Sequence, residues 1–184
     1  PDAPISIAVF EWSSEKHQKL IINWTEITDA KTLTFVARTI RGHRKDREAF
    51  NTAIGSALLF GKVLLDQKTY CARRTIDISS DGGNNDGITP KELYATHSFQ
   101  GVTVNALVVS LKSVADQQNL VVLSRQRLRD YFNEHVIHGP DAFSMLAVGY
   151  EDYERAMTQK LLKELAPAVV SEKGKGSADK LLPL

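Results

Sequence analysis

The sequence contains a single cysteine, Cys71, among its 184 residues. An internal disulfide needs two cysteines and is therefore excluded, as is a zinc site built on a cysteine pair. No apolar run approaches the ~20 residues that a membrane-spanning helix requires, so we expect no membrane span. Basic residues number 23 and acidic residues 22, and the net charge of +1 gives no overall attraction to nucleic acid or to an acidic membrane.

Several common catalytic signatures are also missing. The sequence has no Gly-x-Ser-x-Gly nucleophile elbow, no His-Glu-x-x-His zinc motif and no phosphate-binding loop. The five histidines are scattered without the spacing of a metal-ligand set, and the chain starts with neither an initiator methionine nor a signal peptide. The missing motifs disfavour the commonest hydrolase and nucleotide-binding mechanisms.

Short apolar runs rich in β-branched residues alternate with amphipathic runs along the chain. We expect strands at 5–12, 17–24, 73–79, 101–109 and 142–148. Helices are expected near 28–40, 53–67, 127–137 and 150–165, and a further helix is expected to start at Thr89-Pro90. The first two strands are joined by a short polar turn, which predicts an antiparallel pair. The order predicts a three-layer, doubly wound α/β fold: a mostly parallel sheet with one antiparallel edge strand.

Helix boundaries and apolar stripes can be read locally. Thr28 or Asp29 can cap the first helix, and Thr89-Pro90-Lys91-Glu92 has the sequence of a capping box. The apolar stripe expected to face inward comprises Leu33, Val36, Ala37 and Ile40 in the first helix, and Tyr153, Ala156, Met157, Leu161 and Leu165 in the last. Residues 1–168 are expected to form a single domain, and residues 169–184 a flexible tail that is low in apolar residues.

The strand expected at 73–79 ends in an unusual cluster, Asp81-Gly82-Gly83-Asn84-Asn85. In open α/β sheets, ligands bind beyond the carboxyl ends of the strands. Glycine permits positive φ and a close approach of the backbone to a ligand, and asparagine tolerates turns. The cluster is either a plain strand-to-helix turn or part of a binding site.

Thr52 precedes another helix, at a loop expected on the same edge of the sheet. It can serve as a helix cap together with Asn51. A hydroxyl from Thr52 and a carboxylate from Asp81 that converge at one edge would instead suit a hard cation such as Mg²⁺, which prefers oxygen ligands. Ser13, on the turn after the first strand, is expected near the same edge.

Several stretches, taken in order, resemble the von Willebrand factor type A (VWA) domain and, more specifically, the bacterial DUF1194 family. They are "AVFEWS" (8–13), "TAIGSALLF" (52–60), "RTIDISSDGGNN" (74–85), "GVTVNAL" (101–107), "VIHGPDAF" (136–143) and "YEDYERAMTQKLLKEL" (150–165). The resemblance implies a non-enzymatic protein-binding module that engages an acidic side chain of a partner through a divalent metal. It also implies a bacterial protein that is periplasmic or secreted.

The metal-ion-dependent adhesion site of VWA domains is built on three loops. The resemblance assigns Thr52 to the second loop and Asp81 to the third, with Ser13 and residues 82–85 on the partner-binding rim. The first loop, Asp-x-Ser-x-Ser, is not in the sequence; Asp77-Ile78-Ser79-Ser80 lacks its spacing, and Asp77 is expected to bond polar groups near the sheet face. Without that loop, binding of Mg²⁺, or of Mn²⁺ or Ca²⁺, is expected to be weak or absent.

The strand that carries the first loop would be the central one, between the runs 5–12 and 73–79. Both runs look buried, and an unpaired buried edge is costly. We therefore expect an upstream segment, or a strand donated by another chain, to complete the sheet. Two alternatives for function remain open: a VWA-like scaffold that has lost its metal site, or a metal-dependent hydrolase using Asp81, Asp86 and His97.

Overall fold

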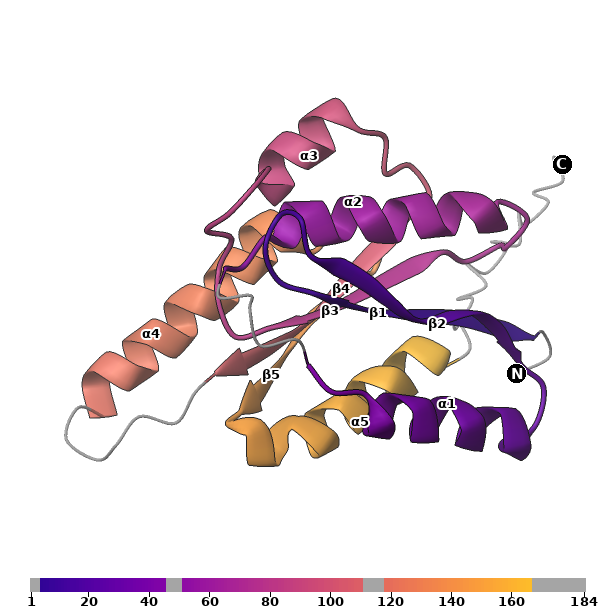
Figure 1. Cartoon of the computed structure of the whole chain (residues 1–184). Coiled ribbons are helices and arrows are strands. Elements are labelled where there is room, and N and C mark those ends of the chain that lie inside the picture. Colours follow the sequence, from indigo (N-terminus) through magenta and orange to yellow (C-terminus); the bar gives the residue numbers. More distant parts are fainter. Residues whose placement is uncertain (1–3, 46–50, 111–117, 167–184) are drawn as a thin grey trace, which may run out of the picture.

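The computed structural model describes residues 4–45, 51–110 and 118–166. Within these residues the strands and helices follow the expected order, and the protein is an α/β protein (Figure 1). The helix expected at 127–137 starts earlier, at Gln118, and continues as a π-helical turn over Phe132–Val136. The strands are β1 (Ile5–Trp12), β2 (Gln18–Ile27), β3 (Thr75–Ser80), β4 (Thr103–Ser110) and β5 (Ser144–Val148). The α-helices are α1 (Ala30–Gly42), α2 (Ile54–Leu65), α3 (Pro90–Thr96), α4 (Gln118–Tyr131) and α5 (Tyr153–Leu165). The predicted tail lies outside the described residues. Among the helices that the structure describes, none is long and apolar enough to cross a membrane.

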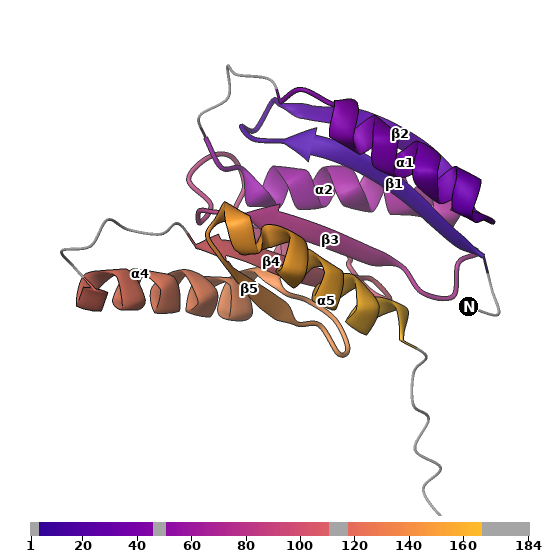
Figure 2. The same cartoon turned by 90° about the horizontal axis from the view of Figure 1, so that it is seen from below.

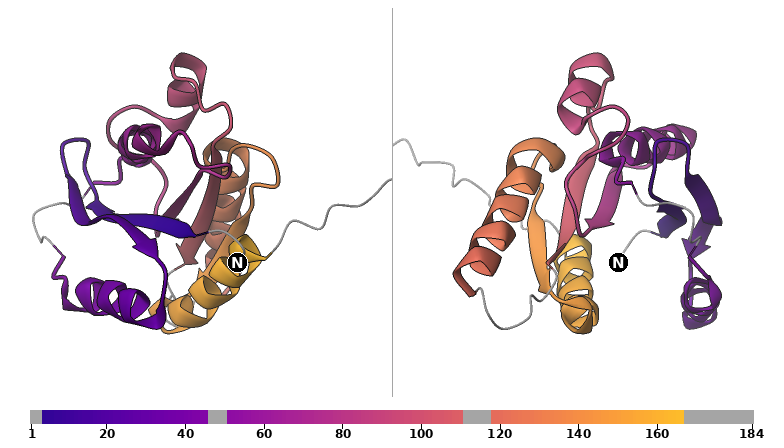
Figure 3. Two further views of the ribbon diagram at one scale, coloured as in Figure 1. Left: turned by 90° about the vertical axis from the view of Figure 1, so that its right-hand side faces the viewer. Right: turned by 60° about the vertical axis from the view of Figure 1, so that its left-hand side comes forward.

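The strands are divided between two sheets. β1 and β2 form an antiparallel hairpin, and β3, β4 and β5 form a parallel sheet in that order. Within the described part of the chain the two sheets are not joined, although the sequence predicted one continuous sheet with an antiparallel edge. The break falls between β1 and β3, where the missing central strand was expected. Figure 3 shows the hairpin and the parallel sheet as separate units in the layer between the helices.

Helices lie on both sides of this layer. α2 and α3 are on one side, and α1 and α5 are on the other, with α1 against the hairpin and α5 against β4 and β5 (Figures 1 and 2). The larger apolar core joins α2 and α3 to the parallel sheet through Leu58, Leu93, Ile78 and Val104. A smaller cluster of Leu107, Ala147 and Ala156 packs on the α5 side.

Local sequence signals explain where several elements begin. Asp29 caps α1, because its carboxylate accepts a hydrogen bond of 2.7 Å from the Thr32 N–H. The predicted capping box at α3 is confirmed: Thr89 and Glu92 each bond the backbone N–H of the other. β4 is a nearly continuous apolar run and is buried on both faces, as a strand in a covered parallel sheet should be.

The apolar stripes of α1 and α5 are only partly covered, which corrects the sequence prediction. In α1 only Val36 is buried, whereas Leu33 and Ile40 are 54% and 46% exposed. In α5, Ala156 is buried but Leu161 and Leu165 are exposed. A helix buries its whole apolar stripe only where the sheet face below it is at least as wide as that stripe. Because α1 contacts a hairpin of only two strands, part of its stripe stays exposed.

Candidate functional site

Three polar segments meet where β1 and β3 end, and we call them together the rim: residues 13–15, 51–53 and 81–87. The Ala53 N–H donates to the Ser13 carbonyl oxygen over 2.7 Å. The Glu15 N–H donates to Asp86 Oδ2 over 2.9 Å. The turn after β1 is therefore bonded both to the segment before α2 and to the loop after β3, although β1 and β3 belong to different sheets.

Thr52 lies directly against the loop that follows β3. Its backbone N–H donates to Asn85 Oδ1 (2.8 Å), and its carbonyl accepts from the Asn85 N–H (2.9 Å). A Cβ atom built on Gly82 would lie 3.5 Å from Thr52 Oγ1. The threonine hydroxyl is thus a close neighbour of the residue that follows Asp81.

Asp81 is exposed, and its carboxylate has one hydrogen-bond donor recorded among the described residues. Tyr150, in the short 3-10 turn after β5, donates its hydroxyl to Asp81 Oδ2 over 2.8 Å. This hydrogen bond to a carboxylate raises the pKa of the Tyr150 phenol above its ordinary value. A neutral phenol therefore approaches the rim from β5, a contact that the sequence pattern did not indicate.

The start of α2 is capped from a distance rather than by Thr52. The N-cap residue is Ala53, and no side chain at that position bonds the helix. Asn84 Oδ1 accepts from the Gly55 N–H over 3.2 Å, and Asn84 Nδ2 donates to the Asp86 carbonyl over 3.0 Å. The capping role considered for Thr52 is wrong, and the side chains of Asn84 and Asn85 hold the loop in place.

Asp86 fastens the rim instead of presenting a carboxylate to solvent. It accepts hydrogen bonds from the backbone of Glu15 and Gly87 and from Asn51 Nδ2. The Glu15 N–H is the main cause that lowers the pKa of Asp86 below its ordinary value. Its oxygens are occupied by the protein's own donors.

Gly82 and Gly83 were expected to permit positive φ in this loop, but neither of them adopts it. Among the described residues, the glycine of this loop with positive φ is Gly87, at 61°. A Cβ there would lie 2.8 Å from Ser56 Oγ, so the position is both left-handed and crowded. Gly82 and Gly83 instead keep the chain close to Thr52 and to the ring of Tyr131.

Ser13 supplies a further hydroxyl at the rim. The residue is buried, and among the described residues its Oγ has no hydrogen-bond partner. An unpaired buried hydroxyl is unusual because burial without a partner costs free energy. No group of three His, Cys, Asp or Glu side chains in the described ranges could hold a metal. The oxygen groups of the rim include the hydroxyls of Ser13 and Thr52 and the carboxylates of Asp81 and Glu15.

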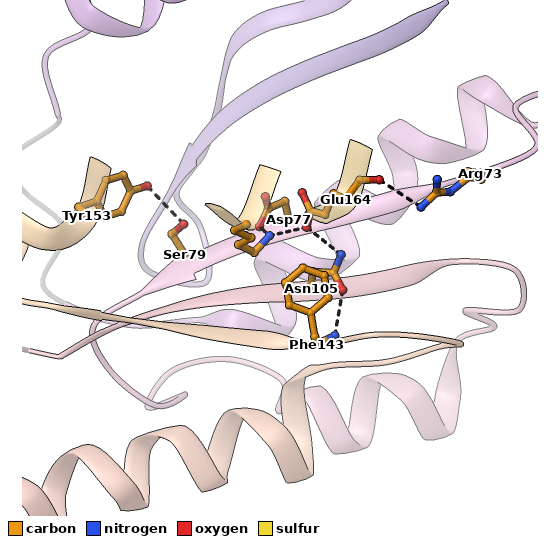
Figure 4. Close-up of polar contacts among 8 residues, drawn as sticks. Arg73, Asp77, Ser79, Asn105, Phe143, Tyr153 and Glu164 are labelled. Carbon is orange, nitrogen blue, oxygen red and sulfur yellow. Dashed lines mark hydrogen bonds and ion pairs between the residues drawn. The ribbon is translucent and has the colours of Figure 1, made fainter. Parts of the chain in front are cut away.

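A second group of polar side chains lies on the face of the parallel sheet that α5 covers, the face opposite α2 and α3 (Figure 4). We call Asp77, Asn105, Lys160 and Glu164 the Lys160 cluster. The fully buried Lys160 ammonium donates to Asp77 Oδ1 and to Glu164 Oε1, the latter over 2.6 Å. Asn105 Nδ2 donates to the same Glu164 oxygen over 2.7 Å, and its Oδ1 accepts from the Phe143 N–H.

The prediction that Asp77 bonds polar groups near the sheet face is confirmed, because Asp77 accepts a hydrogen bond from Lys160. Burial raises the pKa of Asp77 to about 6, and the nearby Glu164 carboxylate adds to this, while Lys160 opposes it. The side chain of Asp77 is 27% exposed, so the burial is incomplete. One signal could have pointed to Lys160: it lies four residues after Ala156, on the inward stripe of α5.

The residues considered for a hydrolase are brought together only in part. Asp81 and Asp86 both lie in the rim loop after β3. His97 is the C-cap residue of α3, and its Nδ1 shares a hydrogen bond of 2.9 Å with Thr96 Oγ1. Among the described residues no hydrogen bond joins His97 to Asp81 or Asp86.

The fold and the rim define an α/β protein with a polar, oxygen-rich edge at the carboxyl ends of strands from two sheets. The chain belongs to the family described as "Protein of unknown function (DUF1194)", whose match covers residues 1–169. The comparison with curated proteins gave no match.

Proposed function

We propose that this protein is a non-enzymatic, VWA-like protein-binding module that engages an acidic side chain of a partner protein through a divalent cation at the rim. The observation that supports this best is the contact between the two predicted ligand loops. Thr52 Oγ1 lies 3.5 Å from the place where a Cβ of Gly82 would be, and Gly82 directly follows Asp81. A hydroxyl and a carboxylate are thus available at one edge of the fold.

The donor set suits a hard cation such as Mg²⁺, Mn²⁺ or Ca²⁺. Asp81 offers a carboxylate, Thr52 a hydroxyl, and Ser13 a buried hydroxyl that has no other partner in the described residues. Asp86 already accepts hydrogen bonds from the Glu15 and Gly87 N–H groups and from Asn51 Nδ2, so Asp81 is the carboxylate that the two predicted ligand loops offer. A Mg²⁺ ion held this way would keep several waters. When bound, the cation supplies a positive centre with an exchangeable position that a partner carboxylate can fill.

The remaining ligands would come from a segment that completes the sheet between β1 and β3. A loop after such a strand would reach the rim, because β1 and β3 both end there. Affinity for the cation is therefore expected to be low for the chain alone. The Tyr150 hydroxyl, which donates to Asp81, favours a second candidate: a VWA-like scaffold whose metal site is lost.

Titration with Mn²⁺, followed by broadening of assigned amide NMR signals, separates the two candidates. We expect selective broadening at Thr52, Asp81 and Gly82, which Asp81→Asn abolishes while leaving the remaining spectrum unchanged. Asp66→Asn is the matched control, because it removes the same charge from the exposed end of α2. Addition of a glutamate-containing peptide should shift the same signals only when metal is present.

Absence of selective broadening at millimolar Mn²⁺, or broadening that survives Asp81→Asn, would support the metal-free scaffold instead.

A further inference from the structure

α1 and the residues directly after it carry a local excess of positive charge. From Ala30 to Lys45 the sequence has no acidic residue and five basic ones: Lys31, Arg38, Arg41, Arg44 and Lys45. The whole chain has 23 basic and 22 acidic residues, so outside this segment acidic residues exceed basic ones by 22 to 18. A concentrated charge of this kind can attract an acidic partner although the net charge of the protein cannot.

The five cations are exposed and are not neutralised by the protein's own acids. None of them forms a salt bridge with a carboxylate of the described residues. Other basic side chains of the fold are paired: Lys62 bonds Asp66, and Arg155 bonds Asp152. The charge of the α1 segment is therefore available to a ligand.

Helix stability does not explain the charge pattern of α1. Lys31 lies in the first turn, which contains no acidic residue, and there the positive end of the helix dipole repels a cation. Arg38 and Arg41 are neighbours of like charge one turn apart, which also disfavours the helix. Arg41, in the last turn, is the helical cation that the dipole stabilises. A pattern with these costs is better explained by a bound anion.

The helical cations share one face of α1 with an exposed aromatic ring. Val36 is buried against the fold, and helical spacing places four side chains on the opposite side: Lys31, Phe35, Arg38 and Arg41. Phe35 is 59% exposed. A shallow hollow of about 390 Å³ on this face is lined by Ala30, Lys31, Thr34, Phe35 and Arg38. Figure 3 shows α1 at the outer edge of the molecule, beside the hairpin.

We propose that this face is a docking surface for an acidic segment of a partner protein, in which an apolar side chain lies among the carboxylates. The surface, called here the basic face, consists of Lys31, Phe35, Arg38, Arg41, Arg44 and Lys45. The arginines present planar forks of N–H donors that match the geometry of carboxylates. The Phe35 ring offers apolar contact area in the hollow between Lys31 and Arg38.

A membrane and a nucleic acid fit the basic face less well. A helix that lies in a membrane surface turns its apolar stripe toward the lipid, whereas the stripe of α1 that contains Val36 faces the hairpin. Single-stranded nucleic acid stacks successive bases on several aromatic side chains, and the basic face has one, Phe35. A long polyanion would also meet the acidic excess of the remaining chain. A short acidic segment avoids that repulsion.

The basic face leads toward the rim. His43, the C-cap residue of α1, shares a hydrogen bond of 2.7 Å with Glu11 Oε2, and Glu11 lies two residues before Ser13 of the rim. One acidic segment could therefore contact the end of α1 and the rim together. Docking on the basic face does not require a cation at the rim, so it goes beyond the proposed function and can hold or fail independently of it.

Fluorescence anisotropy with a labelled peptide of glutamates around one leucine, in buffer with EDTA, measures this docking without any divalent cation. The double variant Arg38→Gln/Arg41→Gln should weaken binding by about 3–30-fold. Lys91→Gln/Arg127→Gln is the matched control, because it removes the same charge from exposed positions on α3 and α4 and should leave the affinity unchanged. Phe35→Ala should weaken binding of this peptide but not of one in which serine replaces the leucine.

The affinity should fall as salt rises from about 50 to 300 mM, and a glutamine version of the peptide should not bind. Three results would overturn the inference: no binding at about 1 mM peptide, equal losses in the two double variants, or no effect of Phe35→Ala. Tighter binding of phosphatidylglycerol vesicles or of an oligonucleotide through Arg38 and Arg41 would overturn it as well. So would sedimentation showing that these arginines join two copies of the chain.

The Mn²⁺ experiment is independent of all these outcomes, because they are measured in EDTA.

Discussion

Thr52 and Asn85 hold each other through two hydrogen bonds, one in each direction. The Thr52 N–H donates to the Asn85 side chain over 2.8 Å, and the Asn85 N–H donates to the Thr52 carbonyl over 2.9 Å. The pair joins the segment before α2 to the loop after β3, and so determines the distance between the two proposed ligand residues.

Replacement of Asn85 tests this relationship. Asn85→Ala leaves the Thr52 N–H without its side-chain acceptor and should lower the free energy of unfolding by about 0.5–1.5 kcal/mol. Asn85→Asp keeps an oxygen at the same place and should retain most of the stability. Urea unfolding measures both, and equal loss in the two variants would show that the side-chain acceptor is unimportant.

The Lys160 cluster predicts a pH dependence of stability. Burial raises the pKa of Asp77 from 3.8 to about 6, so the folded state binds this proton more tightly than the unfolded state. The resulting stabilisation is complete below the unfolded pKa and is lost as pH rises through the folded pKa, by at most about 3 kcal/mol. Urea unfolding between pH 4 and 7.5 should show the loss.

Asp77→Asn should remove this component and flatten the profile, whereas Asp66→Asn, at an exposed position, should leave the profile as in the wild type. A steep profile that persists in Asp77→Asn would assign the pH dependence to another group.

Lys160 is expected to be the most sensitive single position in the cluster. Lys160→Met removes the cation and leaves the Asp77 and Glu164 carboxylates facing each other, which should cost about 3–5 kcal/mol at pH 7. Lys163 lies three residues after Lys160 and is exposed above the Phe143 ring. Lys163→Met should lower the free energy of unfolding by about 1 kcal/mol or less.

Combining Lys160→Met with Asp77→Asn should recover part of the lost stability, because an uncharged amide then replaces one of the two carboxylates that Lys160 no longer neutralises. A double variant as unstable as the sum of the two single variants would contradict the coupling.

Two helical glycines should respond in opposite directions to alanine. A Cβ at Gly55 would overlap the backbone carbonyl of Ile88, so Gly55→Ala should destabilise the fold by about 1–3 kcal/mol. Gly42, in the last turn of α1, has nothing within 4 Å of its Cβ position, and Gly42→Ala should stabilise by about 0.5–1 kcal/mol. Thermal unfolding of both variants measures the difference, and a neutral Gly55→Ala would show that the loop after β3 adjusts freely.

Much of the local structure could be predicted from the sequence. The cap at Asp29, the capping box at Thr89 and Glu92, and the buried strand β4 depend on neighbouring residues and on alternation along one segment. These signals act over a few residues, and no distant contact is needed to interpret them. The expected bonding of Asp77 to polar groups followed from strand alternation in the same way.

Other features depended on contacts between segments far apart in the chain. The periodicity of α1 and α5 correctly marked apolar stripes, but it could not show that Leu33, Ile40 and Leu165 would remain exposed. Likewise, Asn84 caps α2 from 29 residues away, and Tyr150 reaches Asp81 across 69 residues. No local pattern contains such pairings, because they depend on which loops the sheets bring together.

The sequence by itself determined where most helices and strands lie, that a hydroxyl would precede a helix, and that a carboxylate would follow a strand end. The tertiary structure decided that the strands divide into two sheets, that Lys160 is buried between two acids, and that Thr52 and the loop after β3 touch. The physical reason is that backbone propensity and alternation are properties of neighbours. Strand pairing, burial and coordination are properties of the space between distant segments.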